Sequence, residues 1–250
     1  MVRKRDPSAS VGVTGQGCDC MYRVENINKS FEYLKVLEDI SIDFVQGGTT
    51  CILGPSGCGK TTLLNIISGI EKADSGQVLG FTDSELSFVF QEDRLIPWRT
   101  VKENLRFVLS GKPEIQDKDR LVEEYLKKVN LLEYRDYYPS ELSGGMKKRI
   151  GILRAFIYPS SLLLMDEPFS SIDISNKKVI MDFFRDLMDM ENRSCVLVTH
   201  DLEEAIRLGD RIVVLSDKPS RVKRVIQNMY LLEPNEENMV KMKMMLEREF

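Results

Sequence analysis

Residues 54–61 read Gly54-Pro55-Ser56-Gly57-Cys58-Gly59-Lys60-Thr61 and follow a strand-like run from Thr49 to Leu53. The eight residues fit the pattern G-x-x-x-x-G-K-[ST], which is typical of a loop that binds phosphate. Its glycines let the backbone wrap an anion with the N–H groups turned inward, and the next helix points its positive end at the same anion. Helical spacing of the apolar residues between Leu63 and Ile67 predicts that helix. A buried strand, a phosphate-binding loop and a helix are therefore expected in this order.

The end of this loop supplies the side chains that handle the phosphates. Lys60 carries the positive charge expected to face the β- and γ-phosphates, and the Thr61 hydroxyl is expected in the shell of a bound Mg²⁺. We therefore predict ATP and Mg²⁺ as the cofactors. The ATP-binding residues predicted here are Gly54, Pro55, Ser56, Gly57, Cys58, Gly59, Lys60, Thr61 and Thr62.

A second apolar run ends in two acids. Leu162 to Met165 predicts a buried strand, and Asp166 and Glu167 follow it directly. Ligands of open α/β sheets bind at the carboxyl ends of the strands, so Asp166 is expected to reach the Mg²⁺ there. Glu167 is placed to act as the general base that polarises the water attacking the γ-phosphate. Together with the loop at 54–61, the two acids favour catalysis over a solvated strand end.

Strand-like and helical patterns alternate over most of the chain. Segments 23–31 and 36–45 alternate apolar and polar residues as half-buried strands do, and the runs at 195–198 and 211–215 are typical of buried strands. This order predicts an α/β fold with a mostly parallel sheet. The expected division is a disordered tail at 1–20, an antiparallel β subdomain with the first part of a nucleotide-binding core at 21–91, a helical subdomain at 92–142, the second part of the core at 143–216, and a C-terminal extension with a short helix at 217–250.

Composition argues against several classes of protein. The 35 basic and 39 acidic side chains give a net charge of −4, whereas a nucleic-acid-binding protein usually has a basic excess, so no nucleic acid partner is expected. No apolar run approaches the roughly 18 residues that span a bilayer, so a role at a membrane would require docking onto another chain. Five cysteines without a secretory leader indicate a reducing cytosol, and Cys51 and Cys195 are predicted core residues.

The segment Leu142-Ser143-Gly144-Gly145-Met146 resembles the signature sequence of ABC ATPases. No general packing rule requires Ser-Gly-Gly before a helical run that begins at Lys147. The resemblance implies a P-loop NTPase (RecA-like) core with a mostly parallel sheet, an N-terminal antiparallel β subdomain and a helical ABC subdomain.

Other landmarks of this family follow in the expected order. Gln91 ends the run from Leu86 to Phe90 and resembles the Q-loop glutamine, and Ser170-Ser171-Ile172-Asp173 resembles the D-loop. His200 resembles the switch histidine, and Phe31 falls where the family has an aromatic ring that stacks on adenine. Outside this pattern, Phe31 would be assigned to the core and His200 to the surface.

The resemblance implies a role for each of these residues. The catalytic residues would be Glu167, His200, Gln91 and Lys60. The Mg²⁺ ligands would be Thr61, Gln91 and Asp166. The ATP-binding residues would include, besides those of the loop, Phe31, Ser143, Gly144, Gly145 and Asp173.

The resemblance also implies a site shared between two subunits. Ser-Gly-Gly forms a second phosphate cradle, which in ABC proteins closes on the ATP held by the other subunit, and hydrolysis reopens the pair. The implied partners are a second copy or a paired ABC subunit, transmembrane permease subunits and, indirectly, a periplasmic or lipid-anchored substrate-binding protein. The implied location is peripheral, at the cytoplasmic face of the cell membrane.

Further segments look like the nitrate/sulfonate/taurine importer ATPases. These are Val89–Glu92, Leu95–Thr100, Asp166–Phe169 and the run from Val214 to Val222, while Lys148 stands where that family usually has glutamine. Two alternatives remain. The ATPase of an ABC export or lipoprotein-release system would share the catalytic residues but not the Leu95–Thr100 and Pro219–Val222 segments. A soluble non-transport ABC ATPase would usually have two cassettes, a long coiled-coil insertion or basic arms.

Two features outside the predicted site leave alternatives open. Trp98, the only tryptophan, follows Gln91 at the junction with the helical segment. It is either a core residue or an anchor on the groove that receives a permease helix in related importers. The segment from Glu236 to Phe250 has apolar residues at helical spacing and either caps the body or binds a partner.

Overall fold

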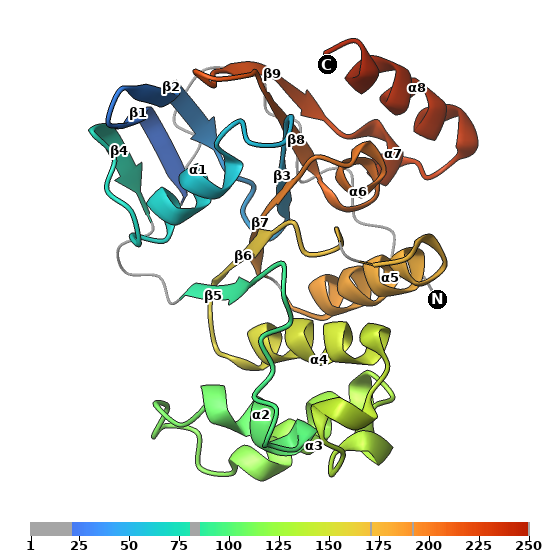
Figure 1. Cartoon of the computed structure of the whole chain (residues 1–250). Helices are drawn as coiled ribbons and strands as arrows, with labels where there is room; N and C mark the ends of the chain where they lie inside the picture. The colour runs from blue at the N-terminus through green and yellow to red at the C-terminus, as the bar shows by residue number, and fades with distance from the viewer. Residues whose placement is uncertain (1–21, 81–85, 171, 192, 250) are drawn as a thin grey trace.

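The structure is a computed structural model that describes residues 22–80, 86–170, 172–191 and 193–249. The tail predicted as disordered, residues 1–20, lies outside these ranges. Ser171, in the segment that resembles a D-loop, also lies outside them. Figure 1 shows two sheets, with helices on both faces of the larger sheet and a helical part below it.

The larger sheet has six strands in the order β5-β6-β7-β3-β8-β9. The strands run parallel except β9, which pairs antiparallel with β8 at one edge. Their bounds are β3 (Thr49–Leu53), β5 (Leu86–Val89), β6 (Leu162–Asp166), β7 (Ser194–Thr199), β8 (Arg211–Leu215) and β9 (Val222–Gln227). The central strands are almost entirely buried, as expected for strands covered on both faces.

The smaller sheet is antiparallel and has the order β2-β1-β4. Its strands are β1 (Arg23–Phe31), β2 (Leu34–Asp43) and β4 (Ser75–Leu79). The predicted α/β fold, with a mostly parallel sheet and an antiparallel N-terminal sheet, is confirmed.

Two hydrophobic clusters fill the two faces of the larger sheet. Ile52 of β3 packs in one cluster with Leu63 of α1 (Lys60–Ile67) and with the small sheet. The next residue, Leu53, belongs to the other cluster, with Ile152 of α4 (Gly144–Ile157) and Phe184 of α5 (Ile174–Met190). Because successive strand residues point to opposite faces, α1 lies on one face of the sheet and α4 with α5 on the other (Figure 1).

The chain between β5 and β6 is helical. It forms α2 (Val101–Val108), α3 (Lys118–Lys128), the 3-10 turns η2 (Leu132–Tyr134) and η3 (Pro139–Glu141), and α4. A capping box of Thr100 and Glu103 begins α2 and satisfies N–H groups of its first turn. Val122 and Leu126 are fully buried on one face of α3.

The C-terminal helices pack on the same face of the large sheet as α4 and α5. They are α6 (Leu202–Leu208), α7 (Met229–Leu232) and α8 (Glu236–Glu247). Met242 and Leu246 of α8 are fully buried in the same cluster as α4 and α5, and α8 packs against α6 and α7. The helix α8 therefore packs on the rest of the fold, which is the first of the two alternatives stated for segment 236–250. Within the described residues, no helix combines the length and the apolar character needed to cross a membrane.

Candidate active site

Three neighbouring strands end at the same edge of the large sheet. Leu53 of β3 pairs with Thr199 of β7, and Val198 of β7 pairs with Asp166 of β6. The loop that starts at Gly54, the acid Glu167 and the imidazole of His200 therefore follow strands that lie side by side. This register brings together residues separated by more than a hundred positions in the sequence.

The phosphate-binding loop is shaped by its glycines. Gly59 is the N-cap residue of α1 and has φ 118°, a left-handed conformation that favours glycine. A Cβ at Gly59 would also lie 2.8 Å from Cγ1 of Val36. Glycine offers no side chain that could accept from the first N–H groups of α1, so these groups are left for an anion. The loop has the geometry of a phosphate cradle.

Lys60 spans the mouth of this loop. Its side chain is 4% exposed, and Nζ donates to the carbonyl oxygens of Gly54 at 3.0 Å and Pro55 at 2.9 Å. The ammonium group is thus held against the backbone of the loop.

Ser220 supports the loop from behind, a role that the sequence pattern did not indicate. Its hydroxyl contacts the carbonyl oxygens of Cys58 and Ser216, and its backbone N–H donates to the carbonyl of Val36. Ser220 is fully buried. It lies 162 residues from Cys58 in the sequence, so only the fold reveals the contact.

Asp166 and Glu167 face the loop from the end of β6. The Thr61 hydroxyl donates to Oδ1 of Asp166 at 3.1 Å. Burial raises the pKa of Asp166, and the hydrogen bond from Thr61 partly offsets this effect. Oε1 of Glu167 lies 3.6 Å from Nζ of Lys60, and Oε2 lies 3.1 Å from Nδ1 of His200. The structure therefore brings five of the predicted site residues into one cluster.

Glu167 has an unusual backbone. Its φ is 42°, in the left-handed region that non-glycine residues rarely adopt. Its N–H donates to the carbonyl of Val198 at 3.0 Å, which holds the turn against β7. Backbone strain of this kind tends to occur where a side chain must be aimed at a site. Here it directs the carboxylate toward Lys60 and His200.

A network of charges anchors the segment that contains His200. Nζ of Lys177, on α5, lies 2.6 Å from Asp201 and 2.5 Å from Glu204, and the Thr199 hydroxyl donates to Glu204 at 2.5 Å. Burial opposes the charge of Lys177, but the hydrogen bonds to the two acids outweigh it and raise its pKa. The network fixes the residues on both sides of His200 to α5.

Other predicted site residues lie apart from this cluster. Phe31 is 44% exposed at the end of β1, so it is not a core residue, and Lys29 lies 4.9 Å from its ring centre. Ser143 caps α4, accepting from the N–H of Met146, and Asp173 caps α5. Within this chain, the Ser143 and Asp173 side chains therefore act as helix caps.

Gln91 and Trp98 lie between β5 and α2. Gln91 is exposed, and its backbone carbonyl accepts from Lys148. Trp98 is 77% exposed. The interpretation of Trp98 as a core residue is therefore wrong.

A phosphate cradle joined to two acids on a parallel sheet is typical of a P-loop NTPase. The profile of the ABC transporter family matches residues 37–170, and the chain belongs to this family. The family that the motifs resemble is thereby confirmed.

Individual relatives agree with this assignment. The chain is 37% identical over 210 residues to the aliphatic sulfonates import ATP-binding protein of Bacillus cereus, over 80% of this chain and 82% of that protein. It is 34% identical over 212 residues to the taurine import ATP-binding protein of Roseobacter denitrificans, over 80% of this chain and 79% of that protein. A dimeric ATP-binding cassette in a post-hydrolysis state, bound to ADP and Pi, matches with a TM-score of 0.68 and 27% identity, over 82% of this chain and 98% of that chain.

Proposed function

We propose that this ABC ATPase is the energy-coupling subunit of an importer, which dimerises around two ATP molecules and drives uptake through a separate permease. The observation that carries the proposal is the position of Glu167 between Lys60 and His200 at the phosphate cradle. The import proteins among its relatives support the direction of transport.

Each residue of the cluster has a separate role in ATP hydrolysis. Lys60 and the N–H groups of the loop bind the β- and γ-phosphates. Glu167 accepts a proton from the attacking water at its carboxylate, and His200 positions that carboxylate. Phe31, which is exposed, offers a ring face to the adenine. Mg²⁺, when bound, offsets the charge of the phosphates.

The residues present fit a magnesium ion. The Thr61 hydroxyl and the Asp166 carboxylate are hard oxygen donors and lie 3.1 Å apart at the end of the loop. Both would hold the ion, and Gln91 would reach it from the segment after β5. Asp166 is itself partly buried, which lowers the competition from water.

The glycines of the signature segment support a second subunit. A Cβ at Gly144 would meet no atom within 4 Å, and one at Gly145 would make only an ordinary contact, at 3.9 Å from Ile180. Packing within this chain therefore does not require glycine at either position. Close approach of a phosphate held by another subunit does require it, with Ser143, Gly144, Gly145 and Asp173 forming the second cradle.

A groove next to β5 supports docking on a permease. It has a volume of about 370 Å³, and Phe88, Phe107 and Tyr158 are among the residues that line it. Trp98 presents a large exposed ring on the segment that follows β5. An aromatic surface with polar edges is typical of interface anchors. We assign it to a cytoplasmic helix of the permease, which places the chain at the cytoplasmic face of the membrane.

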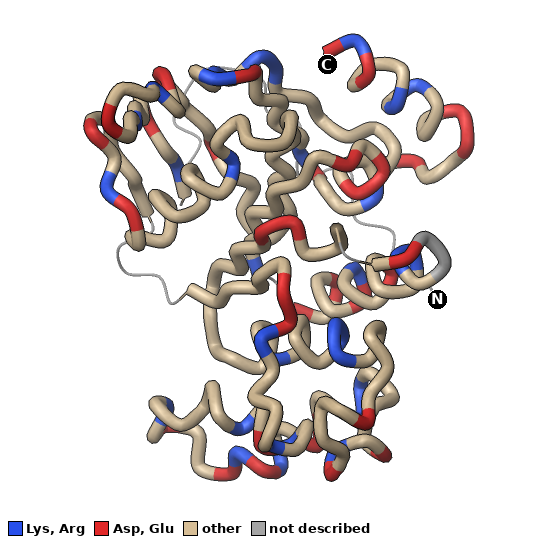
Figure 2. Tube along the Cα trace, in the orientation of Figure 1, with Lys and Arg blue, Asp and Glu red and all other residues tan. Residues whose placement is uncertain are grey.

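The same comparison supports a class of solute. The relatives named above are import ATP-binding proteins for aliphatic sulfonates and for taurine, so a nitrate/sulfonate/taurine-like solute is proposed here. A substrate-binding protein would deliver it to the permease. Along the part of the chain that the structure describes, Figure 2 shows basic and acidic residues interspersed rather than gathered into a basic stripe of the kind that binds nucleic acid. The order of elements supports division of the chain at residues 91, 142 and 216.

Reconstitution tests the proposal. The full chain is assembled with its permease in lipid vesicles, with the binding protein and a labelled sulfonate, taurine or nitrate outside and ATP inside. We expect ATP-dependent accumulation of one of these solutes. Outward movement of a solute, or ATP hydrolysis that no permease stimulates, would favour the export system or the non-transport ATPase instead.

A further inference from the structure

Lys148 has a buried ammonium group on α4, beside the segment that follows β5. Its side chain is 4% exposed, far less than is usual for lysine. Nζ donates to the carbonyl oxygens of Gln91 at 2.7 Å and Phe90 at 3.4 Å, and it lies 3.5 Å from a carboxylate oxygen of Asp93. A charge is buried only where acceptors surround it. Here all of these acceptors come from one short stretch of chain.

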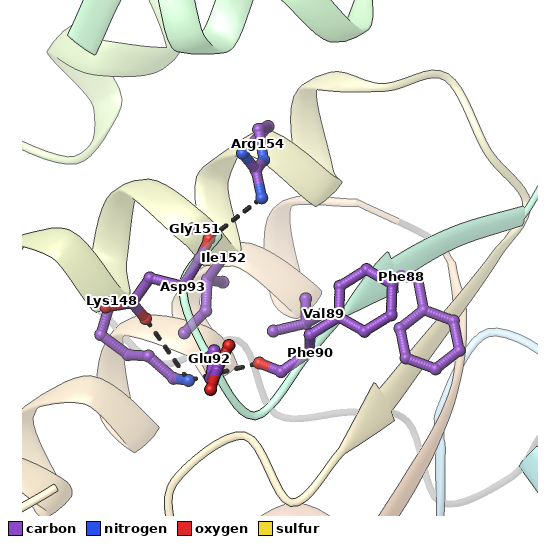
Figure 3. A pocket seen from close by; sticks show the side chains of 9 residues that line it. All are labelled: Phe88, Val89, Phe90, Glu92, Asp93, Lys148, Gly151, Ile152 and Arg154. Carbon is purple, nitrogen blue, oxygen red and sulfur yellow. Dashed lines mark hydrogen bonds and ion pairs between the residues drawn. The ribbon is translucent and has the colours of Figure 1, made fainter. Parts of the chain in front are cut away.

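Arg154, further along the same helix, binds the same stretch. Its guanidinium donates to the carbonyl oxygens of Asp93 at 3.0 Å and Arg94 at 2.7 Å. Figure 3 shows both side chains reaching from α4 to this segment, with dashed lines to its backbone. Residues 90–94 belong to no helix or strand, so their carbonyls depend on such donors.

The backbone position of Gln91 therefore follows α4. The helix begins directly after Ser143, and Lys148 lies about 7.5 Å further along its axis. The distance from Ser143 to Lys148 is little more than one helical turn, and a helix is rigid over so short a length. Any displacement of the Ser143 end of α4 therefore moves Lys148 as well. Because Nζ of Lys148 donates a hydrogen bond of 2.7 Å to the carbonyl oxygen of Gln91, Gln91 moves with it.

The geometry points to Lys148 as a positioning residue that couples the signature end of α4 to Gln91 within one chain. This inference rests on the proposed function, in which Ser143 meets the ATP of the second subunit and Gln91 meets the ATP and Mg²⁺ of its own. Contact of Ser143 with the ATP of the second subunit then sets the position of Gln91 at the ATP of its own subunit. The two ATP sites of the dimer communicate through this contact.

Two variants separate the hydrogen bonds of Lys148 from its packing. Glutamine and methionine have similar length and volume, but only glutamine donates hydrogen bonds. We expect Lys148→Met to lower kcat about tenfold with the KM for ATP unchanged, since a misplaced group costs rate rather than affinity. Lys148→Gln should keep most of the wild-type kcat. Equal kcat values for the two variants would overturn the inference, because packing alone would then matter.

An exposed lysine provides the matched control. Lys127→Met removes a positive charge from the surface of α3 and should leave kcat at the wild-type value. A loss of rate in this control equal to that of Lys148→Met would show a general effect of charge and would overturn the inference.

Hydrogen exchange tests the coupling even if Lys148→Met fails to fold. In the Glu167→Gln chain with ATP, the amides of residues 91–94 and of the first turn of α4 should gain protection together. Protection of the α4 turn without protection of residues 91–94 would overturn this inference but not the proposed function. A wild-type chain that neither binds nor hydrolyses ATP would overturn the proposed function itself.

Discussion

Oε2 of Glu167 lies 3.1 Å from Nδ1 of His200, while Oε1 of the same carboxylate lies 3.6 Å from Nζ of Lys60. Lys60 therefore contacts both the Glu167 carboxylate and the carbonyl oxygens of the loop. The phosphates of ATP carry more negative charge than one carboxylate, so in the proposed mechanism they draw Lys60 toward themselves. The Glu167 carboxylate would then be free to interact with His200 and with the attacking water.

His200→Ala should lower kcat by about a hundredfold, because Glu167 loses the group that orients its carboxylate. The His200 side chain is 46% exposed, so its removal leaves no cavity and the melting temperature should stay close to that of the wild type. Steady-state hydrolysis with a melting curve checks both expectations. A variant that turns over near the wild-type rate would remove His200 from the reaction.

Ser143→Arg should leave ATP binding to a single subunit intact and prevent closure of the dimer, because the long side chain crowds the phosphate of the facing subunit. Lys60→Ala should instead abolish ATP binding, since it removes the main cation at the β- and γ-phosphates. An ATP titration combined with a measurement of molecular size separates the two defects. The same defect in both variants would contradict a site shared between subunits.

Lys177→Met should destabilise the fold by about 2–4 kcal/mol, because it leaves the acids Asp201 and Glu204 without their cation. Glu204 is 1% exposed, so water cannot replace the lost partner. Lys178→Met, at the next and exposed position of α5, is the control and should change stability by less than about 0.5 kcal/mol. Urea unfolding of both variants measures the difference. Equal stabilities would show that the network contributes nothing.

Trp98→Ala should spare folding and the basal ATP hydrolysis of the isolated chain, because the ring is 77% exposed. Transport and solute-stimulated hydrolysis in the assembled complex should fall. Emission of the wild-type chain should be that of a tryptophan in water and should shift to the blue when the permease binds. An unchanged spectrum on binding would remove Trp98 from the interface.

Most of the fold and part of the site could be predicted from local patterns. The strand before Gly54 is fully buried, and the strand that leads to Asp166 begins with four buried apolar residues. The functional residues that follow these strands therefore lie at the carboxyl ends of buried strands. The alternation in segments 23–31 and 36–45 predicts two half-buried strands, and the structure pairs them as antiparallel neighbours. These features depend on residues close in sequence, which is why sequence patterns reveal them.

The supports of the site could not be predicted in the same way. Ser220 binds the carbonyl of Cys58, and Lys148 binds the carbonyl of Gln91. A backbone carbonyl has no signature in the sequence, and both partners are far apart along the chain. The exposure of Trp98 likewise depends on how the segment after β5 lies on the helices, which composition does not decide.

The central claim is that Glu167 is the base of a site completed by two subunits. Glu167→Gln keeps the shape of the side chain but cannot accept the proton of the attacking water, so hydrolysis should fall by at least about a hundredfold. ATP binding should persist, because the amide no longer competes with the phosphates for Lys60. The most direct measurement is the molecular mass of this variant in solution with and without ATP. We predict a monomer without ATP and a dimer holding two ATP molecules with it; a variant that hydrolyses ATP near the wild-type rate, or that stays monomeric with ATP bound, would contradict the account.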